Sequence, residues 1–210
     1  MYIPESFHEI QRDRIEALMR DYPFGLLVSC EDNRPVVNHL PLFYTSTPEP
    51  LGRVIGHMAR ANPQWRAWAK TDGPVLAVFQ GPDAYISPSW YVTPNVPTWN
   101  YAVVQLMGEA RVVTDEARLI EILDRLTDHM ESGRTVPWKA DWGDQGRREQ
   151  IGGIVGFEIR VTDIRAKFKL GQNRSPVDQE RVRERLLHSG RQRETELARL
   201  MRSAGSDGSG

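Results

Sequence analysis

The stretch from Val75 to Val113 most constrains the fold, because strand-like runs flank a loop rich in proline and aromatic residues. Residues 102–112 alternate apolar and polar side chains, which is typical of a half-buried antiparallel strand. The loop before them, Tyr85 to Tyr101, reads YISPSWYVTPNVPTWNY. Prolines stiffen a loop, and closely spaced Trp and Tyr rings offer flat faces with one polar tip each. This composition predicts the rigid wall of a planar-ligand pocket or of a subunit interface, and it also fits a long hairpin connection packed on its own sheet.

The near balance of charges and the single cysteine exclude some functions. The 210 residues carry 27 Lys and Arg against 28 Asp and Glu, a formal net charge of −1. Because dedicated nucleic-acid binders carry a strong basic field, DNA binding is weakly supported, although a local basic patch remains compatible. A lone cysteine, Cys30, excludes an internal disulfide and a Cys-rich zinc site. No apolar run is long enough to cross a membrane and the start is unlike a signal peptide, so we predict a cytoplasmic protein.

Short apolar runs separated by turn residues predict a mostly β (α+β) fold. Asp32 and Asn33 supply turn chemistry between the runs 24–30 and 36–44, which predicts a hairpin. With the further runs 51–58, 75–80, 102–112 and 154–168 there are about six antiparallel strands and few helices, a pattern that indicates a small closed barrel. The apolar residues of the last run change parity near Thr162, which suggests a β-bulge. Small barrels fill their interiors with side chains and leave ligands to the outer rim or to a dimer interface.

Helical segments are expected around this barrel. Ser6 and Glu9 have the spacing of a capping box for a first helix that reaches Arg20, and Asp115 opens a second helix with one apolar stripe. From Pro176 the chain is helical and heavily charged, as is typical of a solvated helix. We therefore predict a barrel domain over 1–170, a charged helical extension over 171–204 and a disordered tail over 205–210.

One helix start has the chemistry of an anion site. Asn62 followed by Pro63 is the pairing expected of an N-cap and first helical position, and Arg60 precedes them. Free amides, an Asn side chain and a guanidinium together would bind a phosphate, although an ordinary capped helix with a solvated arginine has the same sequence. A planar-ligand wall together with an anion pocket favours flavin mononucleotide (FMN) as the cofactor.

The irregular stretch 132–150 carries two tryptophans, Trp138 and Trp142. Their rings fit the cover of a pocket and also fit ordinary packing. The sequence leaves both interpretations open.

Six blocks of sequence resemble one known family. In order they are MYIPESF, NHLPLF, GHMARANPQW, VFQGPDAYISPSWY, VPTWNY and KFKLGQNRS. They are similar to blocks of the PaiB-type FMN-binding negative transcriptional regulators, and the likeness covers the chain up to about the last twenty residues. The resemblance implies an FMN-binding split barrel that forms a homodimer with two cofactor sites at the subunit interface. The chain departs from the family pattern at Gln105, where many members have a histidine.

The same resemblance implies which residues hold the cofactor. The block GHMARANPQW would bind the ribityl phosphate, and the other blocks would contact the isoalloxazine ring system. Lys169 would favour a phosphate or a reduced, anionic flavin. The implied residues are, for the phosphate, His57, Arg60 and Asn62, and for the ring and its rim, Asn38, His39, Leu40, Ser87, Trp90, Tyr91, Trp99, Asn100, Lys169, Gln172 and Asn173.

Several functions remain compatible with these blocks. The family is one of transcriptional regulators, while the flavin would equally serve an FMN-dependent oxidoreductase. A related branch, the piperazate synthases, resembles this family but uses haem b to form nitrogen–nitrogen bonds, and His39 or His57 would then be the axial ligand. A cofactor-free dimer is a further alternative. No catalytic residue and no metal site can be assigned from the spacing of the residues.

Overall fold

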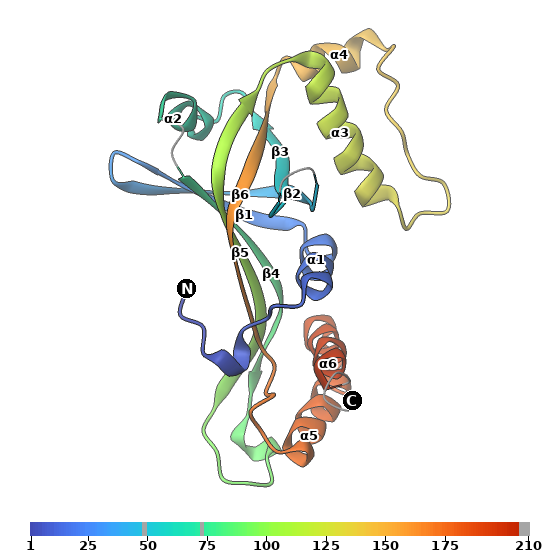
Figure 1. The fold of residues 1–210 in the computed structure, drawn as a ribbon. Helices are drawn as coiled ribbons and strands as arrows, with labels where there is room; N and C mark the ends of the chain where they lie inside the picture. The colour runs from blue at the N-terminus through green and yellow to red at the C-terminus, as the bar shows by residue number, and fades with distance from the viewer. Residues whose placement is uncertain (48–49, 72–73, 206–210) are drawn as a thin grey trace. The chain divides into compact units, whose positions relative to one another are not determined.

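The computed structural model describes residues 1–47, 50–71 and 74–205, and in these ranges six antiparallel strands close into a barrel (Figure 1). Neighbouring strands follow the order β1-β2-β3-β6-β5-β4. The strands are β1 (Phe24–Glu31), β2 (Arg34–Thr45), β3 (Arg53–Ala59), β4 (Pro74–Ile86), β5 (Thr98–Val113) and β6 (Ile154–Lys169). The predicted fold class is confirmed.

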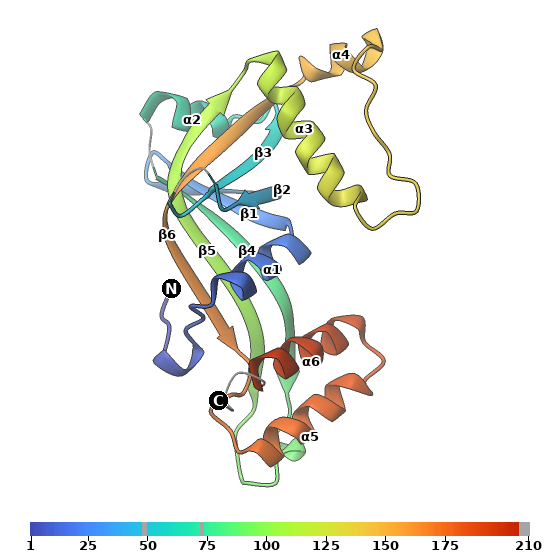
Figure 2. The same cartoon turned by 45° about the vertical axis from the view of Figure 1, so that its right-hand side comes forward.

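Helices occupy the connections and the C-terminal region. They are η1 (Glu5–Phe7), α1 (Arg12–Asp21), α2 (Gln64–Thr71), η2 (Pro88–Trp90), α3 (Glu116–Glu131), α4 (Gln145–Ile151), α5 (Pro176–Leu187) and α6 (Gln192–Gly205). Figures 1 and 2 show α5 and α6 side by side. The predicted tail 205–210 lies outside the described residues except for Gly205. Within the described ranges, no helix is long and apolar enough to cross a lipid bilayer.

Two helix predictions need correction. The capping box at Ser6 is wrong, because the Glu9 side chain instead accepts a hydrogen bond from the Gln11 amide at 2.9 Å, and α1 begins only at Arg12. The stretch 132–150 is also less irregular than expected, since Asp144 accepts from the Arg147 amide at 2.9 Å and caps α4. A short helix that includes a glycine gives little periodic signal in the sequence.

Contacts along the chain divide it into two compact units. We call Met1–Leu18, Gln80–Val104 and Arg165–Gly210 the first unit, and Met19–Phe79 with Gln105–Ile164 the second unit. Strands β4, β5 and β6 each contribute residues to both units. The domain boundary near residue 170 that the sequence suggests stays a prediction.

Local sequence signals explain most strands. Asp32 and Asn33 both have positive φ, 48° and 61°, which is the backbone of a two-residue hairpin turn between β1 and β2. In β6 the buried positions are Val155, Phe157, Ile159 and Val161 and then Ala166 and Phe168, so the predicted change of parity is confirmed. Gly56 is required in β3, because a Cβ there would lie 2.5 Å from the Phe157 ring.

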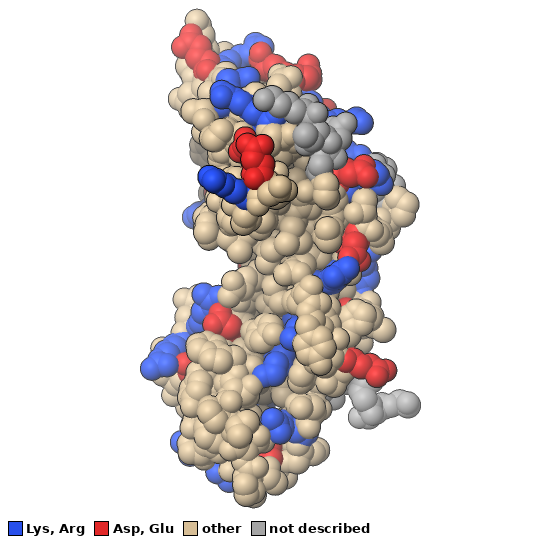
Figure 3. Space-filling model, turned by 90° about the vertical axis from the view of Figure 1, so that its left-hand side faces the viewer, with Lys and Arg blue, Asp and Glu red and all other residues tan. Residues whose placement is uncertain are grey.

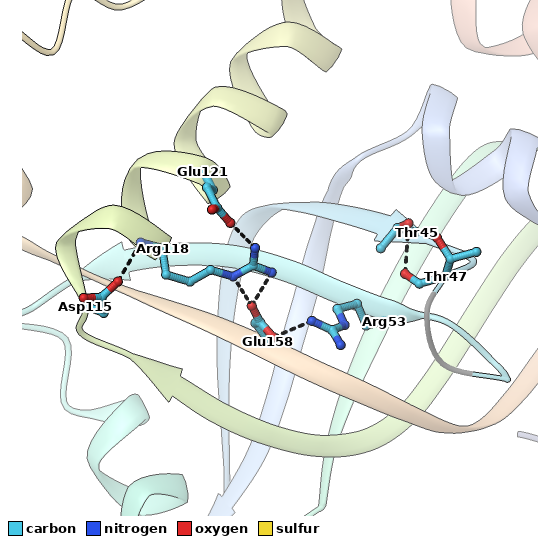
Figure 4. A network of polar contacts seen from close by, with 7 residues as sticks. All are labelled: Thr45, Thr47, Arg53, Asp115, Arg118, Glu121 and Glu158. Atoms are coloured by element: carbon cyan, nitrogen blue, oxygen red, sulfur yellow. Dashed lines mark hydrogen bonds and ion pairs between the residues drawn. The ribbon is translucent and has the colours of Figure 1, made fainter.

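Helix α3 covers the core of the second unit. Its stripe of Leu119, Ile122 and Leu126 packs in one buried cluster with Ile55 and Ile151. At the surface, Glu158 of β6 accepts hydrogen bonds from Arg53 of β3 at 2.7 Å and from Arg118 of α3 at 2.6 Å, while Arg118 also pairs with Glu121 (Figure 4). The half-buried Glu158 therefore fixes the start of α3 against β3 and β6.

Candidate functional site

The fourteen residues predicted to contact the cofactor divide between the two units. The second unit contains Asn38, His39, Leu40, His57, Arg60 and Asn62, and the first unit contains Ser87, Trp90, Tyr91, Trp99, Asn100, Lys169, Gln172 and Asn173.

The start of α2 has the predicted cap. The Asn62 side chain accepts a hydrogen bond from the Gln64 amide at 3.0 Å, which confirms the N-cap. Two residues earlier, Arg60 donates from Nε to the Gly152 carbonyl at 2.6 Å, and its backbone amide donates to Gly153 at 2.8 Å. Both Nη groups of Arg60 are without a partner among the described residues. The guanidinium is thus held in place by one nitrogen and keeps two nitrogens for an anion.

Gln64 supports this cap, and the sequence analysis missed it. Its side chain is buried, with 1% exposed, and Nε2 donates toward the Leu27 carbonyl and Ser29 Oγ, both at 3.1 Å. Its Oε1 accepts from Asn38 Nδ2 at 2.7 Å. In this structure Asn38 therefore orients Gln64 and ties α2 to β1 and β2. The signal that could have revealed it is an amide residue directly after an Asn-Pro helix start.

The two histidines of the second unit differ in environment. His57 on β3 has a buried Nδ1 without a hydrogen-bond partner among the described residues, and burial lowers the pKa of this imidazole below its ordinary value. His57 is therefore neutral near pH 7. His39 on β2 is exposed and stacks on the Phe24 ring at 6.2 Å, and the neighbouring Leu40 is half-buried.

The loop of the first unit between β4 and β5 is held at several points. Ser87 Oγ accepts from the Ser89 amide at 3.3 Å and caps η2, and the Trp90 carbonyl accepts from Arg181 Nε at 3.0 Å. Tyr91 is buried beneath Arg174, whose Cζ lies 5.6 Å from the ring centroid. Trp99, in contrast, is 53% exposed. Of the loop's aromatic rings, Trp99 is the most available for a ligand or a second chain.

Asp178, which the sequence analysis did not single out, fixes this loop to α5. Its buried carboxylate accepts from the Val92 amide at 2.6 Å and from Thr93 Oγ1 at 2.7 Å. These two hydrogen bonds lower the pKa of Asp178 below its ordinary value, and the bond from Thr93 has the larger effect. The Ser-x-x-Asp pattern at Ser175 was the available signal, because the Asp178 amide donates to Ser175 Oγ at the start of α5.

Three cations gather in the first unit around Lys169. Its Nζ donates to the Trp99 carbonyl at 2.7 Å and to Thr98 Oγ1. Burial, and then the charges of Lys167 and Arg174, lower the pKa of Lys169. None of these three cations pairs with a carboxylate among the described residues, whereas the described surface elsewhere has many ion pairs. A cluster of unbalanced positive charge attracts an anionic ligand.

The remaining predicted residues of the first unit have structural partners or are exposed. The Gln172 side chain accepts from the Leu170 amide at 2.8 Å and donates to the Phe168 carbonyl at 2.6 Å, so it shapes the turn after β6. Asn100 is buried and lies 4.0 Å from the Met201 sulfur. Asn173 is exposed. In the described part of the chain, no three His, Cys, Asp or Glu side chains are placed to hold a metal ion.

Comparison with known proteins identifies the family. Residues 1–163 match the family described as "Putative FMN-binding domain". The chain belongs to this FMN-binding family. It is also 37% identical over 202 residues, 96% of each chain, to the Bacillus subtilis (strain 168) "Protease synthase and sporulation protein PAI 2". The predicted resemblance is confirmed, and FMN is the cofactor that the family assigns.

Solved structures share the fold at low sequence identity. An FAD and haem binding protein from Mycobacterium smegmatis matches with a TM-score of 0.61 and 19% identity, covering 77% of this chain and 73% of that one. The conserved hypothetical protein Rv2991 from Mycobacterium tuberculosis matches with a TM-score of 0.60 and 12% identity, covering 84% and 94%. These likenesses establish the split-barrel fold of the FMN-binding family.

Each unit, taken by itself, has residues that fit one part of an FMN molecule. Its phosphate matches the two unpartnered Nη groups of Arg60 and the amides at the start of α2. Its ring system matches the flat exposed face of Trp99 and the cations around Lys169. The second unit thus has groups suited to the anionic tail of the cofactor, and the first unit has groups suited to its planar ring.

Proposed function

We propose that this protein is a PaiB-type FMN protein that carries out a redox function, with the flavin phosphate held by Arg60 and the α2 start. A bound flavin supplies the uptake and release of electron pairs. The residues of the chain bind and orient it. The observation that carries the proposal is the Arg60 guanidinium, because Nε is fixed on Gly152 while both Nη groups stay unpaired among the described residues.

The ring system is proposed to lie against the first-unit cluster of Trp99 and Lys169. A cation beside the ring would stabilise negative charge on a reduced flavin. The neighbouring Lys167 and Arg174, which pair with no carboxylate among the described residues, add to that field. We further propose a homodimer with a cofactor site at each end of the subunit interface, so that both chains contribute residues to one flavin. Support comes from four exposed apolar side chains in or beside one loop, Tyr85, Val92, Val96 and Trp99.

The test of the phosphate site is Arg60→Ala. Loss of a charge-assisted phosphate contact should weaken FMN binding at least about tenfold. The measurement is titration of the FMN-free protein with FMN, followed by flavin absorbance and fluorescence. Arg66→Ala is the matched control, because Arg66 is exposed in the same helix, packs on Trp65 and has no assigned part in the site. Unchanged FMN affinity in Arg60→Ala would show that the phosphate binds elsewhere.

Haem b is the second candidate, and His57 is the residue that bears on it. Its neutral, desolvated imidazole is suited to metal ligation. Metal-bound histidines, however, almost always donate their other ring N–H to a second group, and Nδ1 of His57 has no such partner within the described ranges. We therefore rank haem, and nitrogen–nitrogen bond formation with it, below FMN. A Soret band in the purified protein would reverse this order, and a colourless protein would favour the cofactor-free dimer.

A role as a negative transcriptional regulator is proposed with less structural support. Figure 3 shows Lys and Arg side chains interspersed with Asp and Glu on one face rather than gathered in one stripe. Binding to phosphates weakens steeply as salt is raised. DNA binding that persists at about 200 mM salt and prefers one sequence would support the role as a regulator. Weak binding without sequence preference would argue against that role and leave only the redox function.

A further inference from the structure

A cavity of about 400 Å³ lies in the second unit beneath the 132–144 loop. Leu123 and Thr127 of α3 line one side, and Ile151 and Ile154 line another. Trp138 and Trp142 are also lining residues, so the two tryptophans that the sequence left unexplained both face the same space. Ligand pockets of this volume take small molecules and are built from apolar and aromatic walls with a few polar groups.

Among the fourteen predicted cofactor residues, His57 alone lines this cavity. The remaining lining residues were not connected with FMN by any sequence block. The cavity shares His57 with the predicted phosphate block, but its other nine lining residues make it a candidate site distinct from Arg60 and Asn62.

The charge in the cavity is positive. Of the lining residues, Arg147 carries the permanent charge, and no carboxylate is among them. The Arg147 Cζ atom lies 5.9 Å from the centroid of the Trp138 ring, and Nη1 makes a long 3.4 Å contact to the Asp141 carbonyl. This guanidinium has no ion-pair partner within the described residues. It can bind an incoming anion while it stays stacked on the indole.

Two carboxylates near the tryptophans, Asp124 and Glu131, have hydrogen-bond partners of their own. Asp124 accepts from Trp142 Nε1 at 2.9 Å, which fixes that indole with its ring toward the space. Glu131 accepts from the Trp138 amide at 3.0 Å and pairs with Arg134. His57 adds an uncharged imidazole, because burial lowers its pKa. The walls thus offer two aromatic rings, neutral hydrogen-bonding groups and one cation.

From this combination we infer that the cavity is a binding site for a small aromatic monoanion, such as an aromatic carboxylate, beyond the FMN site proposed above. Its ring would pack between the tryptophans and the apolar side of α3, and its carboxylate would pair with Arg147. Two fused rings with one carboxylate match the volume and the single charge.

The probe is 2-naphthoate, titrated calorimetrically into the full chain with saturating FMN present. We expect saturable 1:1 binding per chain, and at least about tenfold weaker binding of 2-naphthamide, which has the same rings and no charge. Arg147→Gln should weaken the binding of 2-naphthoate by a similar factor and leave the affinity for 2-naphthamide unchanged. Arg148→Gln is the matched control, because Arg148 is the next residue, lies outside the cavity and pairs with Glu116 at 2.5 Å.

Trp138→Leu provides a second variant that keeps an apolar side chain at the mouth. This substitution should weaken the binding of 2-naphthoate more than the binding of decahydronaphthalene-2-carboxylate, which has the charge but no aromatic rings. No saturable binding, or equal binding by Arg147→Gln and the native chain, would overturn the inference. So would displacement of 2-naphthoate by FMN, because the cavity would then be part of the flavin site. Arg60→Ala separates the two proposals, since it should lose FMN and keep 2-naphthoate.

Discussion

At the scale of the residue, His57 is a half-buried titratable side chain. Its Nδ1 has no hydrogen-bond partner in the described ranges, and burial lowers its pKa. The unfolded chain takes up a proton on this residue near pH 6.5, and the folded chain does so only at lower pH. Between these two values the unfolded state binds more protons, so stability falls as the pH falls.

His57→Asn should therefore flatten the pH dependence of stability. The native protein is expected to lose free energy of unfolding as the pH drops from about 7 to 5, while His57→Asn loses less. Urea unfolding at several pH values, without FMN, measures the difference. His188→Asn serves as the control because His188 is exposed at the end of α5, and it should keep the native slope. Parallel curves for His57→Asn and the native protein would contradict the prediction.

At the scale of the element, α5 and the loop between η2 and β5 are joined by one carboxylate. Asp178 belongs to the first turn of α5 and accepts from the backbone and side chain of the loop at Val92 and Thr93. The pKa of Asp178 is lowered, so its contribution to stability is complete above the ordinary carboxyl value and is lost as the pH falls through the lowered one. Acid should therefore release the loop before it unfolds the core.

Asp178→Ala tests this connection. The variant leaves the Val92 amide and the Thr93 hydroxyl without their acceptor. Hydrogen exchange of the Val92 and Thr93 amides should therefore become at least about tenfold faster at neutral pH. Exchange in β1 and β3 should stay unchanged. Glu180→Ala is a matched control, because Glu180 is an exposed carboxylate of the same helix that pairs with Arg183. Equal protection of the loop in Asp178→Ala and the native protein would remove the proposed role of the carboxylate.

At the scale of the whole molecule, the exposed aromatic loop is the surface through which we propose that two chains assemble. Trp99 is 53% exposed and lies edge-on to Tyr85 at 6.2 Å. Val96 in the same loop is 67% exposed. Apolar side chains gathered in this way on one loop are typical of an interaction surface, whereas single exposed ones need no explanation.

We expect twice the monomer mass in light scattering after gel filtration. Trp99→Glu introduces a charge into the proposed interface and should shift the protein to a monomer and weaken FMN binding with it. Val136→Glu is the control, because Val136 is 83% exposed outside this loop. A native monomer that binds FMN would place the flavin within one chain, and a Trp99→Glu variant that remains a dimer would show that the interface lies elsewhere.

The sequence by itself determined what depends on neighbours along the chain. The Asp32-Asn33 turn, the Asn62 cap and the change of parity in β6 could be read directly, because each rests on backbone geometry within a few residues. The six family blocks likewise predicted the split-barrel fold and FMN as the cofactor. Other features became visible only in the folded chain. Asn38 meets Gln64 across 26 residues, and Thr93 meets Asp178 across 85.

Such pairs leave no local pattern, since their contact depends on how strands and helices pack. The cavity beneath Trp138 and Trp142 belongs to the same class, because its walls come from α3, α4, β3, the start of β6 and the loop between the two helices. A tryptophan in sequence is equally compatible with packing and with a pocket. Only the tertiary structure places both indoles and Arg147 around one space. It also shows that no carboxylate is among the residues that line this space.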